Sequence, residues 1–312
     1  MTTEGRDDST PIGVYGKVAS QPDFLRSNAG EFSQCGLDRM LQDGMEAMRA
    51  EGATLPEPPT SFLFAPAGPL CFVGALSPSK DSAGRSFPLT VFAKVPAASL
   101  ADDPSAALTA HVPFIQAAGA LTFVAGDGGL GGPELIAKAR ALPPPPVFPG
   151  GVAAQPSWLD QPAAGLHAAF DDSAAALGYA LRTLSSACDQ AVKMGGAGRA
   201  SAITVDAPAP SVTIREWWIE LVRRRLKWRD TTPSMLWTDG PGGRLLITLG
   251  HPAPGALSYL CNPKSRAGKF WPLGTTVTAA IDNAMNSLTP DQRLRVKSPS
   301  CPLGELLALF TT

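Results

Sequence analysis

The sequence predicts an α/β protein in which helices cover both faces of a sheet. Short apolar segments of strand length alternate with longer segments whose apolar residues recur at three- and four-residue spacing, the pattern of an amphipathic helix. Turns rich in proline and glycine join several of the strand segments, which is typical of hairpins. Hairpin-linked strands interleaved with amphipathic helices can bury both sheet faces only if helices lie on each side.

The first half of the chain contains four predicted strands and three predicted helices. The strands are apolar, β-branched or aromatic segments: Ile12–Val18, Ser61–Phe64, Leu70–Leu76 and Phe87–Lys94. The helices are Phe32–Met48, Ser105–Ala118 and Pro133–Leu142. We expect Pro113 to interrupt the second of these helices, whereas Pro133 takes the favoured first position of the third.

Four consecutive prolines, Pro143–Pro146, mark the clearest linker, because such a run is extended and cannot be helical. We therefore predict an N-terminal α/β domain over residues 1–142 and a linker over residues 143–160. A C-terminal helical and hairpin region, residues 161–312, completes or extends the same fold. Its predicted helices are Gln161–Met194, Val212–Trp228, Thr275–Leu288 and Leu303–Phe310. Its predicted hairpin strands are Met235–Thr238 and Arg244–Leu249.

The hydrophobic content and the net charge of the chain limit the classes of function that it can have. The 312 residues are 44% hydrophobic, enough for one large or two medium cores, and the formal net charge is −1. This balance gives no overall field that favours nucleic acid or anionic lipid, so we expect no nucleic-acid partner and only indirect membrane association. The polar start lacks the features of a signal peptide, and we expect no uncharged apolar run to approach the roughly 18 residues of a membrane span. We expect a cytoplasmic protein.

The cysteines and histidines do not form a recognisable site. Five cysteines are far apart and lack a Cys-x-x-Cys pair, which favours reduced thiols. Three histidines are equally scattered, so we predict no metal and no cofactor.

The polar segment Ser77–Val91 lies between two predicted strands and concentrates charge. It holds Lys80, Asp81 and Arg85, with Gly84 beside the arginine. One interpretation is a solvated hairpin loop whose aspartate and arginine pair locally, which contributes little to stability. The other is a binding loop presented by a rigid scaffold.

Other candidate motifs are weaker. The basic run Arg223–Arg229, with nearby tryptophans, either contacts anionic headgroups or complements the dipole at the end of a helix. The glycine-rich segment Gly126–Gly132 lacks the spacing of a phosphate-binding loop and predicts a flexible connection. No G-x-S-x-G motif occurs. The segment Pro263–Leu273 is similar to Pro78–Leu89, which indicates either a duplicated module or chance in a chain rich in proline and glycine.

Three segments, in this order, resemble the TagF (ImpM) family of type VI secretion accessory proteins. The first is similar to that family's opening motif, Gly-x-Tyr-Gly-Lys-x-Pro-x-x-Gly-Asp-Phe. The matching residues are Tyr15, Gly16, Lys17, Asp23 and Phe24, and Arg26 follows them. Ala19 and Pro22 depart from the motif, which has Pro and Gly at these positions. The second resembles Ser-Pro-x-x-Asp-x-x-Gly-Arg-x-Phe-Pro-Leu through Pro78, Asp81, Gly84, Arg85, Phe87 and Pro88. The third resembles a later Ser-Leu-Trp-Trp-Thr-x-Gly strand through Trp237, with Leu236 replacing a tryptophan.

The resemblance implies a non-catalytic, cytoplasmic bacterial protein that regulates type VI secretion after translation, as a negative regulator. The implied partner is a forkhead-associated scaffold protein or another secretion component. The implied fold is a three-layer α-β-α sandwich with a mixed, longin-like sheet, to which this chain adds a further helical C-terminal region.

We hypothesise that Lys17, Asp23, Arg26, Asp81 and Arg85 form the functional or fold-fixing polar cluster. In this hypothesis Asp23 and Asp81 each orient an arginine by bidentate hydrogen bonding, either to hold the fold or to contact a partner. Two alternatives belong to other classes: an enzyme with a cleft near Asp81 and Arg85, and a membrane-docking module acting through Arg223–Arg229.

Overall fold

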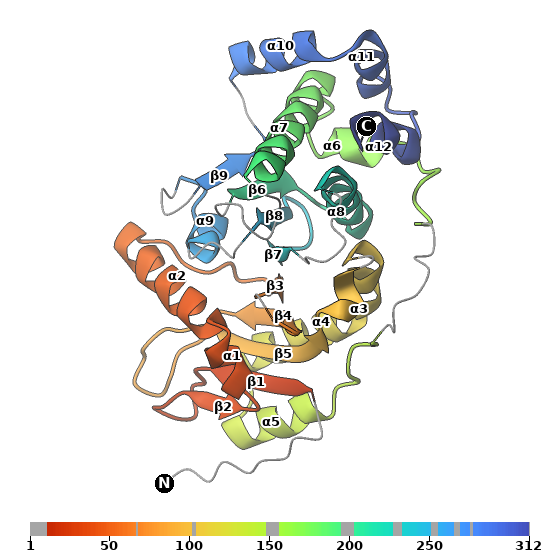
Figure 1. Cartoon of the computed structure of the whole chain (residues 1–312). Coiled ribbons are helices and arrows are strands. Elements are labelled where there is room, and N and C mark those ends of the chain that lie inside the picture. Colours follow the sequence, from red (N-terminus) through yellow and green to blue (C-terminus); the bar gives the residue numbers. More distant parts are fainter. Residues whose placement is uncertain are drawn as a thin grey trace.

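The sheet of this protein has nine strands within the residues that the computed structural model describes, namely 11–66, 68–101, 104–147, 156–194, 203–226, 233–250, 255–264, 269–274 and 277–311. The strands are β1 (Ile12–Gly16), β2 (Leu25–Ser27), β3 (Thr60–Phe64), β4 (Leu70–Ser77), β5 (Leu89–Pro96), β6 (Ile203–Pro208), β7 (Ser234–Trp237), β8 (Arg244–Leu249) and β9 (Lys269–Pro272). They follow the order β2-β1-β5-β4-β3-β7-β8-β6-β9 across the sheet (Figure 1). Strands from before and after the proline-rich linker therefore form two sides of one sheet.

The two sides meet where β3 pairs with β7 in antiparallel orientation, with Leu63 opposite Met235. The other pairs are also antiparallel, except that β6 and β9 are parallel. The sheet is mixed, as predicted, and is continuous between the two halves of the chain.

Helices cover both faces of this sheet (Figure 1). One face carries α1 (Gly30–Gln34), α2 (Leu37–Glu51) and α9 (Ala256–Cys261). The other carries α3 (Ala98–Ala101), α4 (Pro104–Gly126), α5 (Gly132–Arg140), α7 (Ala174–Lys193) and α8 (Val212–Leu226). Against α7 and α8 lie the further helices α6 (Ala164–Ala168), α10 (Thr278–Ser287), α11 (Pro290–Val296) and α12 (Leu303–Thr311). The predicted three-layer α/β fold with additional C-terminal helices is confirmed.

Side chains that alternate along each strand give the sheet two apolar cores. In β4, Cys71, Val73 and Ala75 belong to the core shared with α4, whereas Phe72 and Leu76 belong to the core shared with α2. The strands are therefore buried on both faces, which is why they appear in the sequence as nearly continuous apolar runs.

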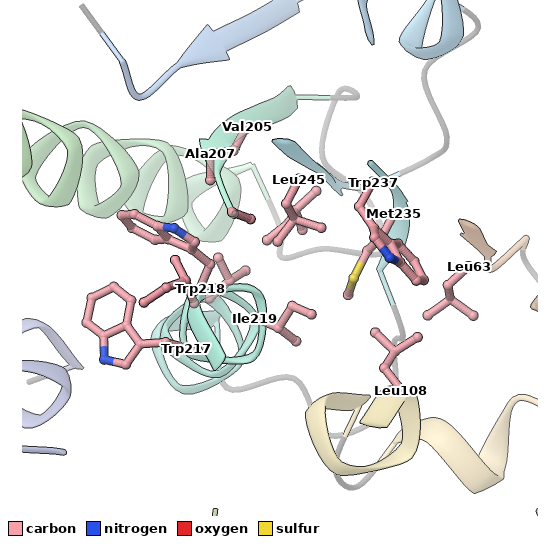
Figure 2. Packing of buried hydrophobic residues seen from close by; sticks show 14 of the residues in the cluster. Leu63, Leu108, Val205, Ala207, Trp217, Trp218, Ile219, Met235, Trp237 and Leu245 are labelled. Atoms are coloured by element: carbon pink, nitrogen blue, oxygen red, sulfur yellow. The ribbon is translucent and has the colours of Figure 1, made fainter. Parts of the chain in front are cut away.

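The core on the α4 and α8 side crosses the junction between β3 and β7. Figure 2 shows its members from both groups of strands and from both helices: Leu63, Leu108, Ile219, Met235, Trp237 and Leu245. Trp217 and Trp218 of α8 extend this core, with their rings edge to face and 5.0 Å apart between centroids. One apolar cluster thus spans both halves of the chain.

Two helices that were predicted as continuous are each divided in two. The predicted helix Phe32–Met48 is α1 followed by α2, because Gly36 between them has a φ of 84°, which no right-handed helix contains. The predicted helix Gln161–Met194 is α6 followed by α7, because Asp171 and Asp172 have φ values of 52° and 57°. Ser173 then caps α7 by accepting a hydrogen bond from the amide of Ala176. Apolar spacing alone does not reveal such breaks.

Helix α4 differs from its prediction in the opposite way, because it continues through Pro113. Pro113 is exposed, whereas Phe114 and Ile115 are buried. Packing of this apolar helix against β4 and β5 outweighs the loss of one backbone hydrogen bond, which costs about 3 kcal/mol.

The stretch Leu108–Gly126 of α4 also corrects the expectation that no segment has the length and hydropathy of a membrane span. Within the described part of the chain, this stretch meets that criterion by length and composition. In the structure, α4 packs against β4, β5 and α8.

The proline-rich linker is held against its neighbours. The carbonyl oxygen of Pro146 lies 3.0 Å from Nε2 of His111 in α4. Beyond residues 148–155, which lie outside the described structure, the indole nitrogen of Trp158 donates to Oε2 of Glu216 in α8 at 2.8 Å. The segment 143–147 forms no helix or strand, as the prolines predicted.

Elements that the sequence did not predict are β2, β6, β9, α3, α9 and α11. Strand β6 did carry a signal, since Ile203, Val205 and Ala207 enter the core while Thr204 and Asp206 alternate with them. The others are too short for a periodic pattern. The end of the predicted helix Val212–Trp228, beyond Leu226, lies outside the described residues.

We predict that Leu63→Ala destabilises the whole sheet, because Leu63 is fully buried where β3 meets β7. Loss of a buried leucine side chain should lower the free energy of unfolding by about 2–5 kcal/mol. Urea denaturation followed by circular dichroism measures the change. Leu294→Ala, at an exposed leucine of α11, is the control and should change stability by less than about 0.5 kcal/mol. Equal midpoints for the two variants would show that the junction is not part of the cooperative core.

Candidate binding site around the β4–β5 loop

Asp81 is the centre of the polar cluster in the β4–β5 loop. Its Oδ2 accepts hydrogen bonds from Nζ of Lys17 and from Nε of Arg85, each at 2.7 Å. The side chain of Asp81 is fully buried and that of Lys17 is 8% exposed, whereas that of Arg85 is 59% exposed. A buried carboxylate thus joins a buried lysine after β1 to an arginine at the surface.

The second carboxylate oxygen of Asp81 shapes the loop itself. Oδ1 accepts hydrogen bonds from the backbone amides of Ala83 at 3.0 Å and Arg85 at 2.8 Å. The amide of Gly84 donates to the Asp81 carbonyl at 2.9 Å, and Gly84 has a φ of 79°, which glycine adopts without strain. The Asp-x-x-Gly-Arg spacing therefore has a local cause: the aspartate caps a tight turn that only glycine closes easily.

Three hydrogen bonds hold this loop against the segment between β1 and β2. Oγ of Ser79 donates to the carbonyl of Lys17 at 2.7 Å, and the amide of Ser82 donates to the carbonyl of Gln21 at 3.1 Å. Nη2 of Arg85 donates to the carbonyl of Pro22. The first two sequence motifs, which are about sixty positions apart in the chain, form one structural unit.

Gly16 allows the closest backbone approach in this unit. A Cβ atom at Gly16 would lie 2.2 Å from the carbonyl oxygen of Pro88, and the φ of Gly16 is 139°. The end of β1 therefore packs directly on the backbone that enters β5. Pro78, at the start of the same loop, approaches α4 in a similar way, since a Cβ at Gly126 would lie 2.5 Å from the Pro78 carbonyl oxygen.

An aromatic cluster supports the polar unit. The ring centroid of Phe24 lies 4.9 Å from that of Phe87 and 5.5 Å from that of Tyr15. Nζ of Lys17 is 5.3 Å from the Phe24 ring, and the guanidinium carbon of Arg26 is 5.8 Å from it. Twelve of the thirteen predicted site residues therefore meet at the adjoining ends of β1, β2, β4 and β5.

The orienting roles predicted for two aspartates need correction. Asp81 does hold Arg85, but through Nε alone, because Nη2 binds Pro22; the pairing is not bidentate. Asp23 is exposed, and within the described residues no arginine forms an ion pair with its side chain. The geometry of the intervening turn, which the sequence does not specify, decides where each carboxylate points.

The charge of Asp81 is stabilised in the folded protein. Burial alone would raise the pKa of this carboxyl group, but hydrogen bonds from Lys17 and from the backbone and side chain of Arg85 outweigh that effect. The pKa therefore lies far below its ordinary value. Asp81 remains ionised at neutral pH and is poorly suited to accept a proton.

Trp237 lies apart from this unit, at the end of β7 and in the opposite core. The buried guanidinium of Arg215 lies 5.0 Å from its ring, and Nη1 of Arg215 donates to Oδ1 of Asp239 at 2.6 Å. The third sequence motif thus fixes the β7–β8 hairpin to α8.

Each described arginine of the basic run forms an ion pair with a neighbouring carboxylate. Arg223 and Arg224 both donate to the buried carboxylate of Glu220, at 2.7 and 2.6 Å. Nη2 of Arg225 donates to Oδ1 of Asp189 at 2.8 Å. Trp217 and Trp218 are buried rather than interfacial, and residues 227–230 lie outside the described structure.

The enzyme alternative requires a cleft that joins Asp81, Arg85 and a histidine. Two histidines, His111 and His167, are buried, and burial lowers the pKa of both; His251 lies outside the described residues. A small apolar hollow instead lies at the junction of β3 with β7, lined by Met40, Phe62, Leu63, Phe64, Ser234, Met235, Leu236, Leu246, Thr248 and Ala256. Neither Asp81 nor Arg85 lines it.

Sequence reasoning missed several residues that build the site. Ser79 binds the Lys17 carbonyl, and Nη2 of Arg49 donates to the Ser86 carbonyl at 3.2 Å. Neither residue carried a signal, because a serine or an arginine that binds a distant carbonyl has no characteristic spacing.

The two similar segments, Pro78–Leu89 and Pro263–Leu273, lie in different settings. The first joins antiparallel strands β4 and β5, whereas the second joins α9 to β9, which pairs in parallel with β6. Residues 265–268 of the second segment lie outside the described structure. The described residues therefore do not repeat the first loop.

Comparison with known protein families gives a match in the first part of the chain. Residues 13–140 match the family described as "TagF N-terminal domain, Type VI secretion system-associated". No curated protein matches the chain. Among solved structures, the crystal structure of PA0076 from Pseudomonas aeruginosa PAO1 is similar, with 18% sequence identity, a TM-score of 0.49, and coverage of 82% of this chain and 96% of that one. The family match spans β1 to α5 and includes both loop motifs.

We predict that Asp81→Asn destabilises the protein at neutral pH but matters less in acid. Because the folded-state pKa of Asp81 is lowered, its stabilising contribution is present above the unfolded-state pKa of about 3.9 and is lost as the pH falls toward the folded-state value. Denaturant midpoints of the wild type and the variant should therefore approach each other progressively as the pH falls below about 4.

The matched control for that series is Asp43→Asn, which removes an exposed carboxylate 3.9 Å from Nε of Arg39. An exposed pair contributes little, so this variant should follow the wild type throughout. A constant gap between wild type and Asp81→Asn at every pH would contradict the predicted linkage.

We also predict that Gly16→Ala destabilises the protein by about 2–4 kcal/mol, because the new methyl group meets the Pro88 backbone and the φ of 139° is strained for alanine. Gly30→Ala is the control: a Cβ there meets nothing within 4 Å, and replacing this glycine should be neutral or slightly stabilising. Thermal denaturation of both variants provides the measurement, and similar melting temperatures would refute the close-approach argument.

Proposed function

Residues 13–140 form a TagF N-terminal domain of the type associated with type VI secretion, and from this premise we propose that the chain is a regulatory accessory protein of such a system. It acts in the cytoplasm, after translation, by binding a forkhead-associated scaffold protein or another secretion component. Binding holds secretion in check without a chemical reaction on the partner.

The arrangement around Asp81 is the observation that carries this proposal. The charged residues of the loop motif hold two chain segments together: Lys17 and Arg85 bind one carboxylate, and Arg85 also binds the Pro22 carbonyl. The motif therefore builds a fixed surface from the β1–β2 and β4–β5 loops. Fixed surfaces of this kind bind partners with a small loss of conformational entropy.

Binding accounts for this geometry better than catalysis does. A catalytic carboxylate must take up or release a proton near the working pH. Asp81 instead accepts four hydrogen bonds, from two side chains and two backbone amides, and its pKa is lowered. Such a group serves as a structural anion.

We predict that the tagged full-length chain, expressed in a bacterium with its own active type VI system, recovers the forkhead-associated scaffold protein by affinity purification. Overproduction should lower the amount of secreted type VI tube protein in the culture medium. Bait carrying Asp81→Asn should recover less scaffold protein, because the loop loses a charged anchor, while Asp43→Asn bait should match the wild type. If wild-type bait recovers no secretion component and overproduction leaves secretion unchanged, the proposed function is wrong.

A further inference from the structure

We infer that the partner presents an acidic segment to one surface of this protein, which we call the Phe24 surface and which consists of Phe24, Arg26, Arg49, Lys80 and Arg85. The inference rests on the proposed function, because it names the chemistry of the partner that the protein binds.

The five residues are connected through contacts of the two loops. Phe24 is half-buried, its ring packs edge to face on that of Phe87, and Arg26 lies 5.8 Å from the same ring. Arg49 of α2 reaches the loop by its hydrogen bond to the Ser86 carbonyl, and Lys80 pairs with Ser86 in a β-bridge. These contacts place Arg26 beside a partly exposed aromatic ring, and place Lys80, Arg85 and Arg49 on or against the loop that leads to Phe87, which packs on that ring.

Arg85 is the most strongly oriented of these cations. Nε binds Asp81 and Nη2 binds the Pro22 carbonyl, yet 59% of the side chain is exposed. A guanidinium group has five N–H donors in a planar fork, so Arg85 has donors left for a further acceptor. Because the fold already holds Arg85 in place, binding such an acceptor costs little additional conformational entropy. A carboxylate matches the geometry of the fork.

The charges of the described loops point to an acidic ligand. Residues 16–27 and 77–88 contain more cations than carboxylates: Lys17, Arg26, Lys80 and Arg85 against Asp23 and Asp81. The charge of Asp81 is buried and matched by Lys17, and Arg49 adds a further cation at the loop. Asp38 of α2, whose charge acts on Tyr15, offsets part of this excess. The whole chain has a formal net charge of −1, so the positive excess is local.

A protein segment fits this surface better than a lipid surface does. Juxtamembrane segments that bind anionic lipid usually carry clusters of four to eight flexible lysines and arginines. Here Arg85 and Arg49 are held by hydrogen bonds to backbone carbonyls, and Arg26 lies beside an aromatic ring. Arginine beside a packed aromatic ring is typical of the residues that contribute most to protein–protein binding.

The test is a pair of double charge reversals in the full-length protein. Arg26→Glu with Lys80→Glu changes two exposed cations of the Phe24 surface, and Arg182→Glu with Lys297→Glu makes the same change in net charge at exposed positions of α7 and the end of α11. These helices lie at the other end of the molecule (Figure 1). Circular dichroism and melting temperature establish that both variants are folded. The probe is purified full-length forkhead-associated scaffold protein, titrated at 50 and 300 mM NaCl, concentrations on either side of physiological ionic strength.

The Phe24 double variant should bind the scaffold protein roughly 10- to 100-fold more weakly than the wild type, and the α7–α11 variant should bind within about twofold of it. Wild-type affinity should fall as salt rises. Equal weakening of both variants would mean that net charge alone is responsible and would overturn the inference, as would unchanged binding of the Phe24 variant; either result leaves the proposed function standing. Failure of the wild type to bind the scaffold protein would overturn this inference, whereas the proposed function is then decided by the affinity purification and the secretion measurement.

The last measurement is flotation with vesicles of phosphatidylglycerol and phosphatidylcholine. We expect neither the wild type nor the Phe24 variant to float with them. If the wild type floats, the Phe24 variant does not, and both bind the scaffold protein equally, the surface binds lipid. That result would contradict the inference that it binds an acidic protein segment.

Discussion

Burial of the sheet on both faces is the constraint on which the rest of this structure depends. Because side chains alternate along a strand, a sheet with apolar residues on both faces must be covered twice. Helices α1, α2 and α9 cover one face, and α4, α5, α7 and α8 cover the other. The pairing of β3 with β7 makes these layers continuous, so that residues from both sides of the linker share each core. The linker connects parts of one sheet.

The polar unit around Asp81 is a consequence of that scaffold. Strands β1 and β5 are hydrogen-bonded neighbours, which brings the residue after β1 beside the loop that enters β5. A lysine and an aspartate from distant parts of the chain can then form a buried pair, whose remaining carboxylate oxygen accepts two backbone amides. A buried charge is tolerated only when it is paired and hydrogen-bonded in this way. The same bonds fix the exposed Arg85, which connects the interior of the fold to the proposed binding surface.

Charge is distributed unevenly over the protein despite its near-neutral total. Glu220 and Asp189 form ion pairs with the three described arginines at the end of α8, and Asp206 holds Arg244 through two hydrogen bonds beside Tyr259. The described arginines of the densest basic cluster in the sequence are therefore engaged within the fold. The cations of the Phe24 surface are more dispersed in sequence, and Arg26, Arg49, Lys80 and Arg85 are exposed.

The sequence by itself determined the α/β class, most of the long elements and the turn around Asp81, because these follow from local patterns. Period-two and helical apolar spacing identify strands and amphipathic helices, and Asp81, Gly84 and Arg85 form a turn within five residues. Only the tertiary structure decided which distant segments of the chain pack against each other. The break at Gly36, the continuity of α4 through Pro113 and the pairing of β3 with β7 depend on backbone conformation or on packing between distant segments. The partner of Asp81 was likewise beyond the sequence: Arg85 is local, but Lys17 is 64 positions away and is placed beside it by the sheet.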